Sequence, residues 1–365
     1  MIIPIQSELK YQYLKLLNMS VLYIVLCIIF VFLVYQKRLQ KYKNLPPGPF
    51  ALPIIGSIPF LKGKGGIVGW MVDESLYKYG KDFCTIWMGT IPFIWVQDFG
   101  LAKELFGKEE FSARIEAWYF KNIHGLNGRS LGISWESGHF WQDQRRFTLK
   151  HLRELGFGKQ SLDTMMQEEV REFINMMLIT ANSDKQKNIS IDDGFFNFAV
   201  VNILWQIVAS EKLDSSDPEK QKIMRMLCKF NRQGHRLVDF ISIVRPFVPY
   251  NDCDKNVFAL KDIIRNQVFD HQRHLYEGDE PRDFMDIYLK EMENEKKRCE
   301  NQYSSETSNF FIEQLVVICL DLFSAGSETT STTLSWAIMY VSFNIDVQRK
   351  CQQEIDALIG GKIFL

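Results

Sequence analysis

Cysteines at metal-binding or redox spacing are missing from this chain. Its seven cysteines are odd in number and scattered, and no two of them stand as Cys-x-x-Cys. This usage excludes a zinc or iron–sulfur centre built on cysteine pairs, and it indicates reduced thiols in a reducing compartment. Histidine is also scarce. Only His271 and His274 stand three residues apart, in a charged helix end, where we expect a solvated face and no metal site.

An excess of positive charge is missing as well. The 43 Lys and Arg residues are balanced by 44 Asp and Glu residues, and they alternate with acids along the chain. Without a basic stripe, nucleic acid is not an expected partner. Glycine-rich phosphate loops are absent too, because Gly63-Lys64-Gly65-Gly66 matches neither GxxxxGK[ST] nor GxGxxG. We therefore interpret residues 63–66 as an ordinary loop.

One long apolar run lies near the N-terminus. Leu16–Tyr35 is long enough to cross the roughly 30 Å hydrocarbon core of a bilayer, and no small-residue cleavage site follows it. This pattern predicts a retained signal anchor in residues 1–36. More positive residues follow the run than precede it, which predicts a cytosolic position for the rest of the chain. The sequon Asn188-Ile189-Ser190 is then expected to remain unglycosylated.

A basic, proline-rich hinge is predicted in residues 37–60. Leu45-Pro46-Pro47-Gly48-Pro49 cannot be helical, and Pro53 and Pro59 continue the extended connection. The remaining residues, 61–365, are predicted to form one globular domain with a large core, since 46% of the chain is hydrophobic.

The expected fold of this domain is mainly α with a small β-hairpin. Phe83–Met88 and Ile91–Val96 are the predicted strands, joined by Gly89-Thr90. Trp118–Ser134 has no period and is predicted to be a long ordered loop that lines a site. Apolar residues at helical spacing predict helices at Phe99–Phe106, His139–Phe147, Gln160–Ala181, Phe195–Ser210, Glu219–Arg232, Val257–His274, Asp283–Lys296, Asn309–Phe343 and Asp346–Ile359.

The helix at Asn309–Phe343 is apolar in both outer parts, which we expect to be buried, but small and polar in its middle. Ala325 and Gly326 leave room for a ligand, and the Thr329 hydroxyl can bond back to the Ala325 carbonyl. Glu328 adds a carboxylate, and a carboxylate beside a hydroxyl is suited to moving protons. A small-residue packing crossing is the alternative, but it does not explain an acid among hydroxyl residues.

A second candidate site lies on the helix at His139–Phe147. Trp141 and Arg145 stand at i and i+4, so an indole N–H and a guanidinium can converge on one anion, such as a carboxylate or a propionate. An amphipathic helix with an aromatic core residue and a surface arginine explains this pair equally well.

These features, in this order, resemble the microsomal cytochrome P-450 family. Four segments are similar in sequence to the branch of drug-metabolising and arthropod hormone-modifying enzymes. They are Phe140–Leu149, Leu155–Lys159, Glu280–Asp286 and Ala325–Thr330. The resemblance implies haem b held through its propionate by Trp141 and Arg145, and an oxygen pocket bordered by Ala325 and Gly326. It implies proton delivery by Glu328 and Thr329.

The same resemblance implies a reaction, partners and a location. Family members insert one oxygen atom of O₂ into a lipophilic substrate. They take electrons from a flavoprotein reductase that uses NADPH, and they lie on the endoplasmic reticulum membrane with the globular part in the cytosol.

The sequence departs from the family in its last part. The ExxR pair and the FxxGxRxCxG haem-ligand loop do not occur before Leu365. Two interpretations follow: a C-terminally truncated or incomplete monooxygenase sequence, or a short, haem-free membrane protein with an interaction or regulatory role. The features of residues 1–360 favour the first, and a chain without the ligand loop is predicted to be inactive.

Overall fold

The computed structural model describes residues 3–60, 74–156, 160–183, 195–213, 217–233, 236–241, 244–275, 280–302 and 308–360, with the single residues 189 and 191. Two of the three sequon positions, Asn188 and Ser190, lie outside these residues, as do residues 63–66. The chain divides into two compact units. One comprises residues 1–112 and 236–245, and the other comprises residues 113–235 and 246–365.

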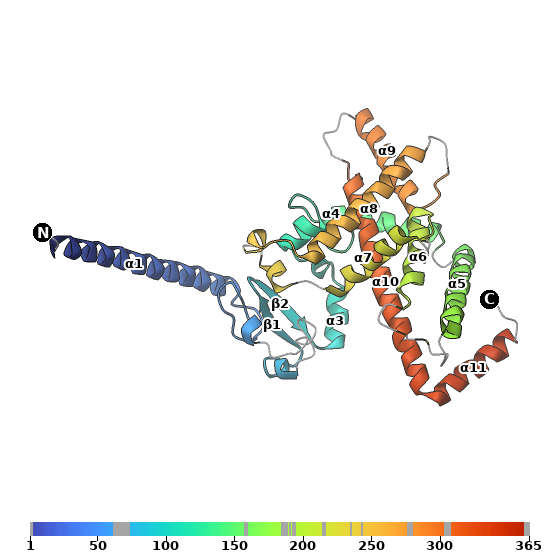
Figure 1. The fold of residues 1–365 in the computed structure, drawn as a ribbon, viewed down its shortest axis with the longest axis horizontal. Coiled ribbons are helices and arrows are strands. Elements are labelled where there is room, and N and C mark those ends of the chain that lie inside the picture. The colour runs from blue at the N-terminus through green and yellow to red at the C-terminus, as the bar shows by residue number, and fades with distance from the viewer. Residues whose placement is uncertain are drawn as a thin grey trace. The chain divides into compact units, whose positions relative to one another are not determined.

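The first unit begins with one long helix, α1 (Ile3–Lys41; Figure 1). Its apolar part, Met19–Lys37, has a mean hydropathy of 2.5 and no buried residue, and is long enough to span a membrane. The helix continues through Lys41, because Lys, Arg and Gln are good helix formers. The basic residues that follow the apolar run are therefore helical up to Lys41.

The predicted hairpin is confirmed at the same residues. β1 (Phe83–Met88) and β2 (Ile91–Val96) pair antiparallel, with Phe83 opposite Val96 and Met88 opposite Ile91. The proline-rich segment runs beside β1, because the Thr85 N–H donates to the Pro47 carbonyl over 3.0 Å. A Cβ on Gly48 would lie 1.8 Å from the Thr85 carbonyl oxygen, so only glycine permits this approach.

Short elements complete the first unit. α3 (Phe99–Phe106) has the predicted bounds and is capped by Asp98, whose side chain accepts the Leu101 N–H. The other elements are the short helices η1 (Ile58–Phe60), η2 (Glu74–Lys78), η3 (Glu109–Phe111) and η5 (Leu237–Phe240).

The second unit is built around α10 (Ile312–Phe343), the helix with the polar middle (Figure 1). Its first half is buried from Gln314 to Asp321 and again at Phe323, and it packs most extensively on α6 (Asn197–Ala209) and α8 (Asp252–His274). The ring of Trp205 on α6 stacks on Phe323 at 4.8 Å between centroids. Burial on most faces explains why this half is apolar all round.

The remaining predicted helices of this unit are confirmed. They are α4 (Gly138–Glu154), α5 (Gln160–Ser183), α7 (Pro218–Gln233), α9 (Phe284–Gln302) and α11 (Ile345–Ile359). Of these, α4 and α9 run seven and six residues past their predicted ends. The predicted loop at Trp118–Ser134 contains one π-helical turn, η4 (Phe120–His124), and is otherwise irregular.

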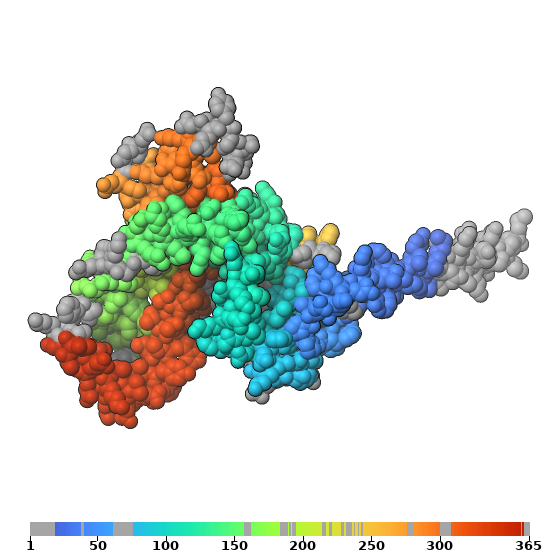
Figure 2. All heavy atoms as spheres, turned by 180° about the vertical axis from the view of Figure 1, so that it is seen from behind, coloured from blue at the N-terminus to red at the C-terminus, as the bar shows by residue number. Residues whose placement is uncertain are grey.

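One expectation about α10 is wrong. Its second apolar part was expected to be buried, but Leu334, Trp336 and Tyr340 are 41%, 52% and 62% exposed. Figure 2 shows the end of α10 and α11, in red, at the surface. The reason is that hydrophobic composition predicts a need for burial, whereas packing requires a partner, and no described element covers this face.

Candidate functional site

The polar middle of α10 lies where the helix passes from buried to open. Thr329 donates its hydroxyl to the Ala325 carbonyl over 2.8 Å, as the sequence predicts. Thr333 repeats this bond to the Thr329 carbonyl at 2.7 Å. Ala325, Thr329 and Thr333 are exposed, whereas Ser327 and Ser331 are buried on the opposite side. The segment therefore presents one open face that carries hydroxyl groups.

Gly326 and Glu328 differ in what surrounds them. A Cβ on Gly326 would come within 2.7 Å of Leu204 Cδ1, so this glycine lets α6 approach α10 closely. The packing alternative thus accounts for Gly326. Glu328 is half-buried, and no residue in the described part of the chain pairs with its carboxylate. Packing does not explain this acid, which remains available for a proton-transfer role.

Asp321, one helical turn before Ala325 on α10, is the most heavily bonded acid in this region. Its Oδ2 accepts the N–H groups of Ile133 and Ser134 at 2.7 and 3.0 Å, and its Oδ1 lies 3.0 Å from His124 Nε2. The side chain is buried. A buried carboxylate needs such donors, because it would otherwise lose its hydration without compensation. Asp321 therefore holds the 124–134 loop on α10.

The Ile133–Ser134 segment also uses its carbonyl groups. Ile133 accepts the indole N–H of Trp141 at 2.8 Å, and Ser134 accepts Nε of Arg114 at 3.1 Å. This dipeptide therefore connects Asp321 on α10 to Trp141 on α4. Beside it, Gly132 has φ +86, and a Cβ there would lie 2.2 Å from Asp321 Oδ2, so glycine is required.

Trp141 and Arg145 lie together, as their i, i+4 spacing predicts. The guanidinium carbon of Arg145 is 5.5 Å from the centre of the Trp141 ring, and that of Arg114 is 5.9 Å from the same ring. Arg145 is exposed, and no carboxylate among the described residues pairs with it. Two cations against one indole fit a carboxylate-bearing ligand. The Trp141 N–H is directed to Ile133 in this structure, so the Arg145 guanidinium is the available donor.

A buried lysine fastens the other end of the same loop. Lys261 on α8 donates to the carbonyl groups of Ile123, His124 and Gly125 at 3.5, 3.2 and 2.8 Å. Burial lowers the pKa of Lys261 to about 8. The lysine caps the C-terminal end of η4, where unpaired carbonyl groups favour a cation.

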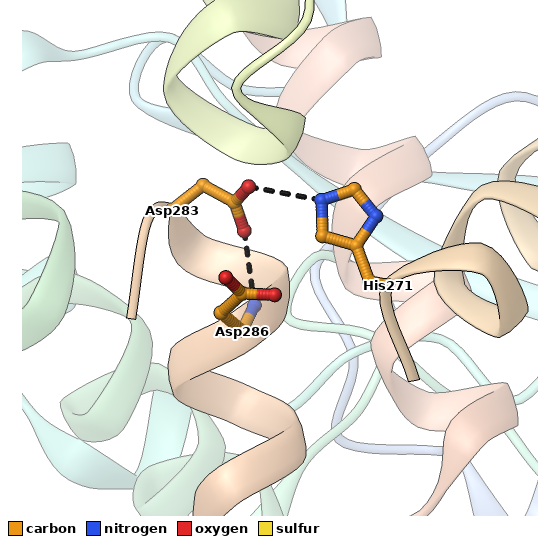
Figure 3. Close-up of side chains that lie close together, drawn as sticks. All are labelled: His271, Asp283 and Asp286. Carbon is orange, nitrogen blue, oxygen red and sulfur yellow. Dashed lines mark hydrogen bonds and ion pairs between the residues drawn. The ribbon is translucent and has the colours of Figure 1, made fainter. Parts of the chain in front are cut away.

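The expectation of a solvated His271 is wrong, although His274 is exposed. His271 is buried, with Nε2 at 2.9 Å from Asp283 Oδ2 and Nδ1 at 2.9 Å from the Gln267 carbonyl (Figure 3). Burial lowers the pKa of His271, but the hydrogen bond and charge of Asp283 outweigh it, and the net shift is upward. The start of α9 covers this face, which helical spacing alone does not reveal.

His271, Asp283 and Asp286 are close enough together to hold a metal ion, yet each has an internal partner. Both ring nitrogens of His271 face acceptors, which the protonated ring satisfies as a double donor. Arg282 donates to both oxygens of Asp286 at 2.6 and 3.0 Å. The cluster is explained by an ionic link between the end of α8 and the start of α9.

The helical fold, the two arginines at Trp141 and the hydroxyl face on α10 agree with one class of protein. The Cytochrome P450 family model matches residues 46–363 of this chain. The chain belongs to the cytochrome P450 family.

Particular relatives narrow the comparison. The chain is 33% identical over 345 residues to "Cytochrome P450 2J3" of Rattus norvegicus. This alignment covers 91% of this chain and 64% of the relative. It is 31% identical over 332 residues to "Cytochrome P450 2L1" of Panulirus argus, covering 88% and 64% respectively. It is 30% identical over 353 residues to "Farnesoate epoxidase" of Bombyx mori, covering 92% and 66%. The chain thus spans about two thirds of these relatives.

Haem is the group that this family implies, and the residues fit part of it. Arg114 and Arg145 beside Trp141 suit its carboxylates, and the open face of α10 leaves Ala325 and Thr329 accessible. None of the six cysteines described is in a disulfide, and none stands in the FxxGxRxCxG motif. The described residues therefore offer cations for the haem carboxylates and an open helix face with hydroxyl groups.

Proposed function

We propose that this chain is part of a membrane-bound monooxygenase that inserts one oxygen atom of O₂ into a lipophilic small molecule. The link through Ile133 and Ser134 carries this proposal, since it joins Trp141, beside Arg145, to Asp321 on α10, one turn before the hydroxyl face. The Bombyx mori relative is named as an epoxidase of farnesoate, which supports a lipophilic hormone, lipid or xenobiotic as the substrate class.

The proposed roles follow the chemistry of each side chain. Arg145 and Trp141 hold a haem propionate, with the guanidinium as the principal donor in the observed geometry. Ala325 and Gly326 border the oxygen pocket. Glu328 and Thr329 would deliver protons at the open face of α10, because a carboxylate and a hydroxyl can each accept and donate a proton. Bound haem in this family supplies the redox chemistry, with electrons from an NADPH-dependent flavoprotein reductase.

A membrane location follows from α1. The helix carries the exposed apolar stretch Met19–Lys37, and the positive residues after it support a cytosolic globule on the endoplasmic reticulum. In microsomes, Asn188 should stay unmodified. A glycan that disappears in Asn188→Gln would place the globule on the other side of the membrane.

Thr329→Ala tests the proton role in a form of the protein supplied with the thiolate ligand loop. Loss of the hydroxyl should raise NADPH consumption relative to product formation several-fold, while substrate binding changes little. Thr333→Ala is the matched control, because Thr333 is exposed and makes the same back-bond one turn later. Equal coupling in the two variants would remove Thr329 from the proposed relay.

A second function rests on a different observation. The apolar end of α10 is exposed, as a protein-binding helix face would be. A membrane-anchored interaction or regulatory protein has this feature. Reducing the 365-residue chain with haem under carbon monoxide separates the two functions. The thiolate type of spectrum would reject the haem-free function.

A further inference from the structure

A cavity lies within the first unit and is lined by residues of that unit alone. It has a volume of about 1070 Å³ and is formed between the end of α1 and the turns at Pro53-Ile54 and Thr90. Figure 1 shows this end of α1 beside β1 and β2. Nothing in the proposed oxygenase chemistry uses this cavity.

Two aromatic contacts build the cavity. The Tyr35 hydroxyl donates to the Ala51 carbonyl over 2.5 Å, and Tyr42 packs its ring edge-to-face against Trp87 at 5.5 Å between centroids. Tyr35 lies on α1 and Tyr42 is the first residue after it, so the end of the helix is fastened at two points. The space between helix and hairpin is thus held open by specific contacts.

The lining changes from apolar to basic along α1. Phe30, Val31 and Val34 line the end nearest the middle of the apolar stretch, and Lys37 and Lys41 line the other end. The candidate span ends at Lys37. At 1.5 Å of rise per residue, Phe30 lies about 10 Å further into the membrane than Lys37. A phospholipid has the same order, with its phosphate at the surface and its acyl chains below.

Charge at the basic end indicates an anionic occupant. No Asp or Glu lines the cavity, and neither lysine pairs with a carboxylate in the described part of the chain. Lys37 and Lys41 stand at i and i+4, so their ammonium groups lie on one face and can approach the same phosphate. Lysines at this depth attract anionic lipids.

Ile54 adds an independent observation. It lines the cavity with a φ of +67, a conformation that β-branched residues rarely adopt, and it is 45% exposed. Backbone strain of this kind is concentrated at ligand clamps. The strain places an apolar side chain at the cavity wall, where an acyl chain would cover it.

We infer that this cavity binds one anionic phospholipid, with the phosphate at Lys37 and Lys41 and an acyl chain along Val34 and Ile54. The inference rests on the proposed role of α1 as a membrane anchor. A lipid is favoured over a free phosphate because most of the lining is apolar. The bound lipid would fix the globule against the anchor, filling the space between them.

The test uses the full chain in bilayer discs of phosphatidylcholine containing phosphatidylserine. After extraction in mild detergent, retained lipid is counted by native mass spectrometry. We expect one retained phosphatidylserine per protein. At about fivefold per lysine, K37Q/K41Q should weaken its retention about 25-fold. The control K43Q/K81Q removes the same charge from exposed positions that do not line the cavity, and it should retain the lipid.

Ile54→Gly separates lipid binding from folding. Glycine accepts the positive φ, so thermal stability should stay equal or rise, while lipid retention falls several-fold. A variant that loses the lipid only together with its stability would contradict the inference.

Equal loss in K43Q/K81Q would show general charge attraction, and equal retention of phosphatidylcholine would exclude a headgroup site. Displacement of the lipid by inorganic phosphate would show an anion site without acyl recognition and would also overturn the inference.

Failure of the lipid site can be distinguished from failure of the proposed membrane anchor. Release of the protein from membranes by alkaline carbonate would reject the anchor itself. A chain that stays in the membrane but retains no phosphatidylserine would reject only the lipid site.

Discussion

The two halves of α10 have similar apolar composition and opposite surroundings. Leu320 in the first half is fully buried, whereas Leu334 in the second is 41% exposed. The polar segment with Ala325 and Thr329 lies between them. A helix that is packed at one end and open at the other places its functional groups at the boundary, where they are held firmly yet accessible. Packing of the first half positions the site.

Asp321→Asn should give the largest effect on the packed half. It replaces a buried carboxylate oxygen with an amide group that faces N–H donors, and we expect a loss of about 3–5 kcal/mol in the free energy of unfolding. Denaturant titration measures this loss. Asp346→Asn, at an exposed acid of α11, should stay within about 0.5 kcal/mol. Similar stabilities for the two variants would mean that Asp321 does not hold the loop.

A leucine pair compares the halves directly. Leu320→Ala should lower the free energy of unfolding by about 3 kcal/mol, since it leaves a cavity in a packed interior. Leu334→Ala should cost less than about 1 kcal/mol, because its side chain already contacts solvent. An equal cost at both positions would show that the second half is covered in solution.

Gly326→Ala sharpens the distinction between packing and ligand access. The added methyl group meets the end of the flexible Leu204 side chain at 2.7 Å, so we expect a cost of about 1–2 kcal/mol. Adding Leu204→Ala should relieve the clash, and the double variant should then lose less than the sum of the two single changes. Simple additivity would argue against the contact.

The pH dependence of the link between α8 and α9 gives a smaller effect. The pKa of His271 is raised, so the folded state binds this proton more tightly than the unfolded chain. The contribution of this proton to the stability of the folded state is complete below the unfolded pKa of about 6.5. It is lost as pH rises through the folded pKa. Thermal unfolding across this range should show the decline in the native chain but not in His271→Gln.

For Lys261 we expect stability to change with pH in the opposite direction, at higher pH. Its pKa of about 8 lies below the ordinary 10.5, so the unfolded chain binds more protons between these values. Stability should therefore rise with pH across that interval. Lys261→Met should lack this rise, and a rise that persists in the variant would assign it to other groups.

Local contacts could be predicted from the sequence, and distant ones could not. The hairpin, the Thr329 back-bond and the proximity of Trp141 to Arg145 follow from periods of two and four residues. The bond from Asp321 to Ile133 joins positions 188 residues apart, and no local pattern encodes it. A signal was present, because Asp321 interrupts an apolar run and a buried acid requires donors. His271 lacked such a signal, since its partner Asp283 belongs to the next helix.

Carboxylate recognition by Arg145 on α4 is the central claim of this account. The most direct measurement compares the affinity of the full chain for haem and for haem dimethyl ester, whose propionates are neutral. The account predicts at least tenfold tighter binding of haem, with the difference largely lost in Arg145→Ala and kept in Arg146→Ala, an exposed neighbour on the same helix. Equal affinities for haem and its ester in the native chain would contradict it.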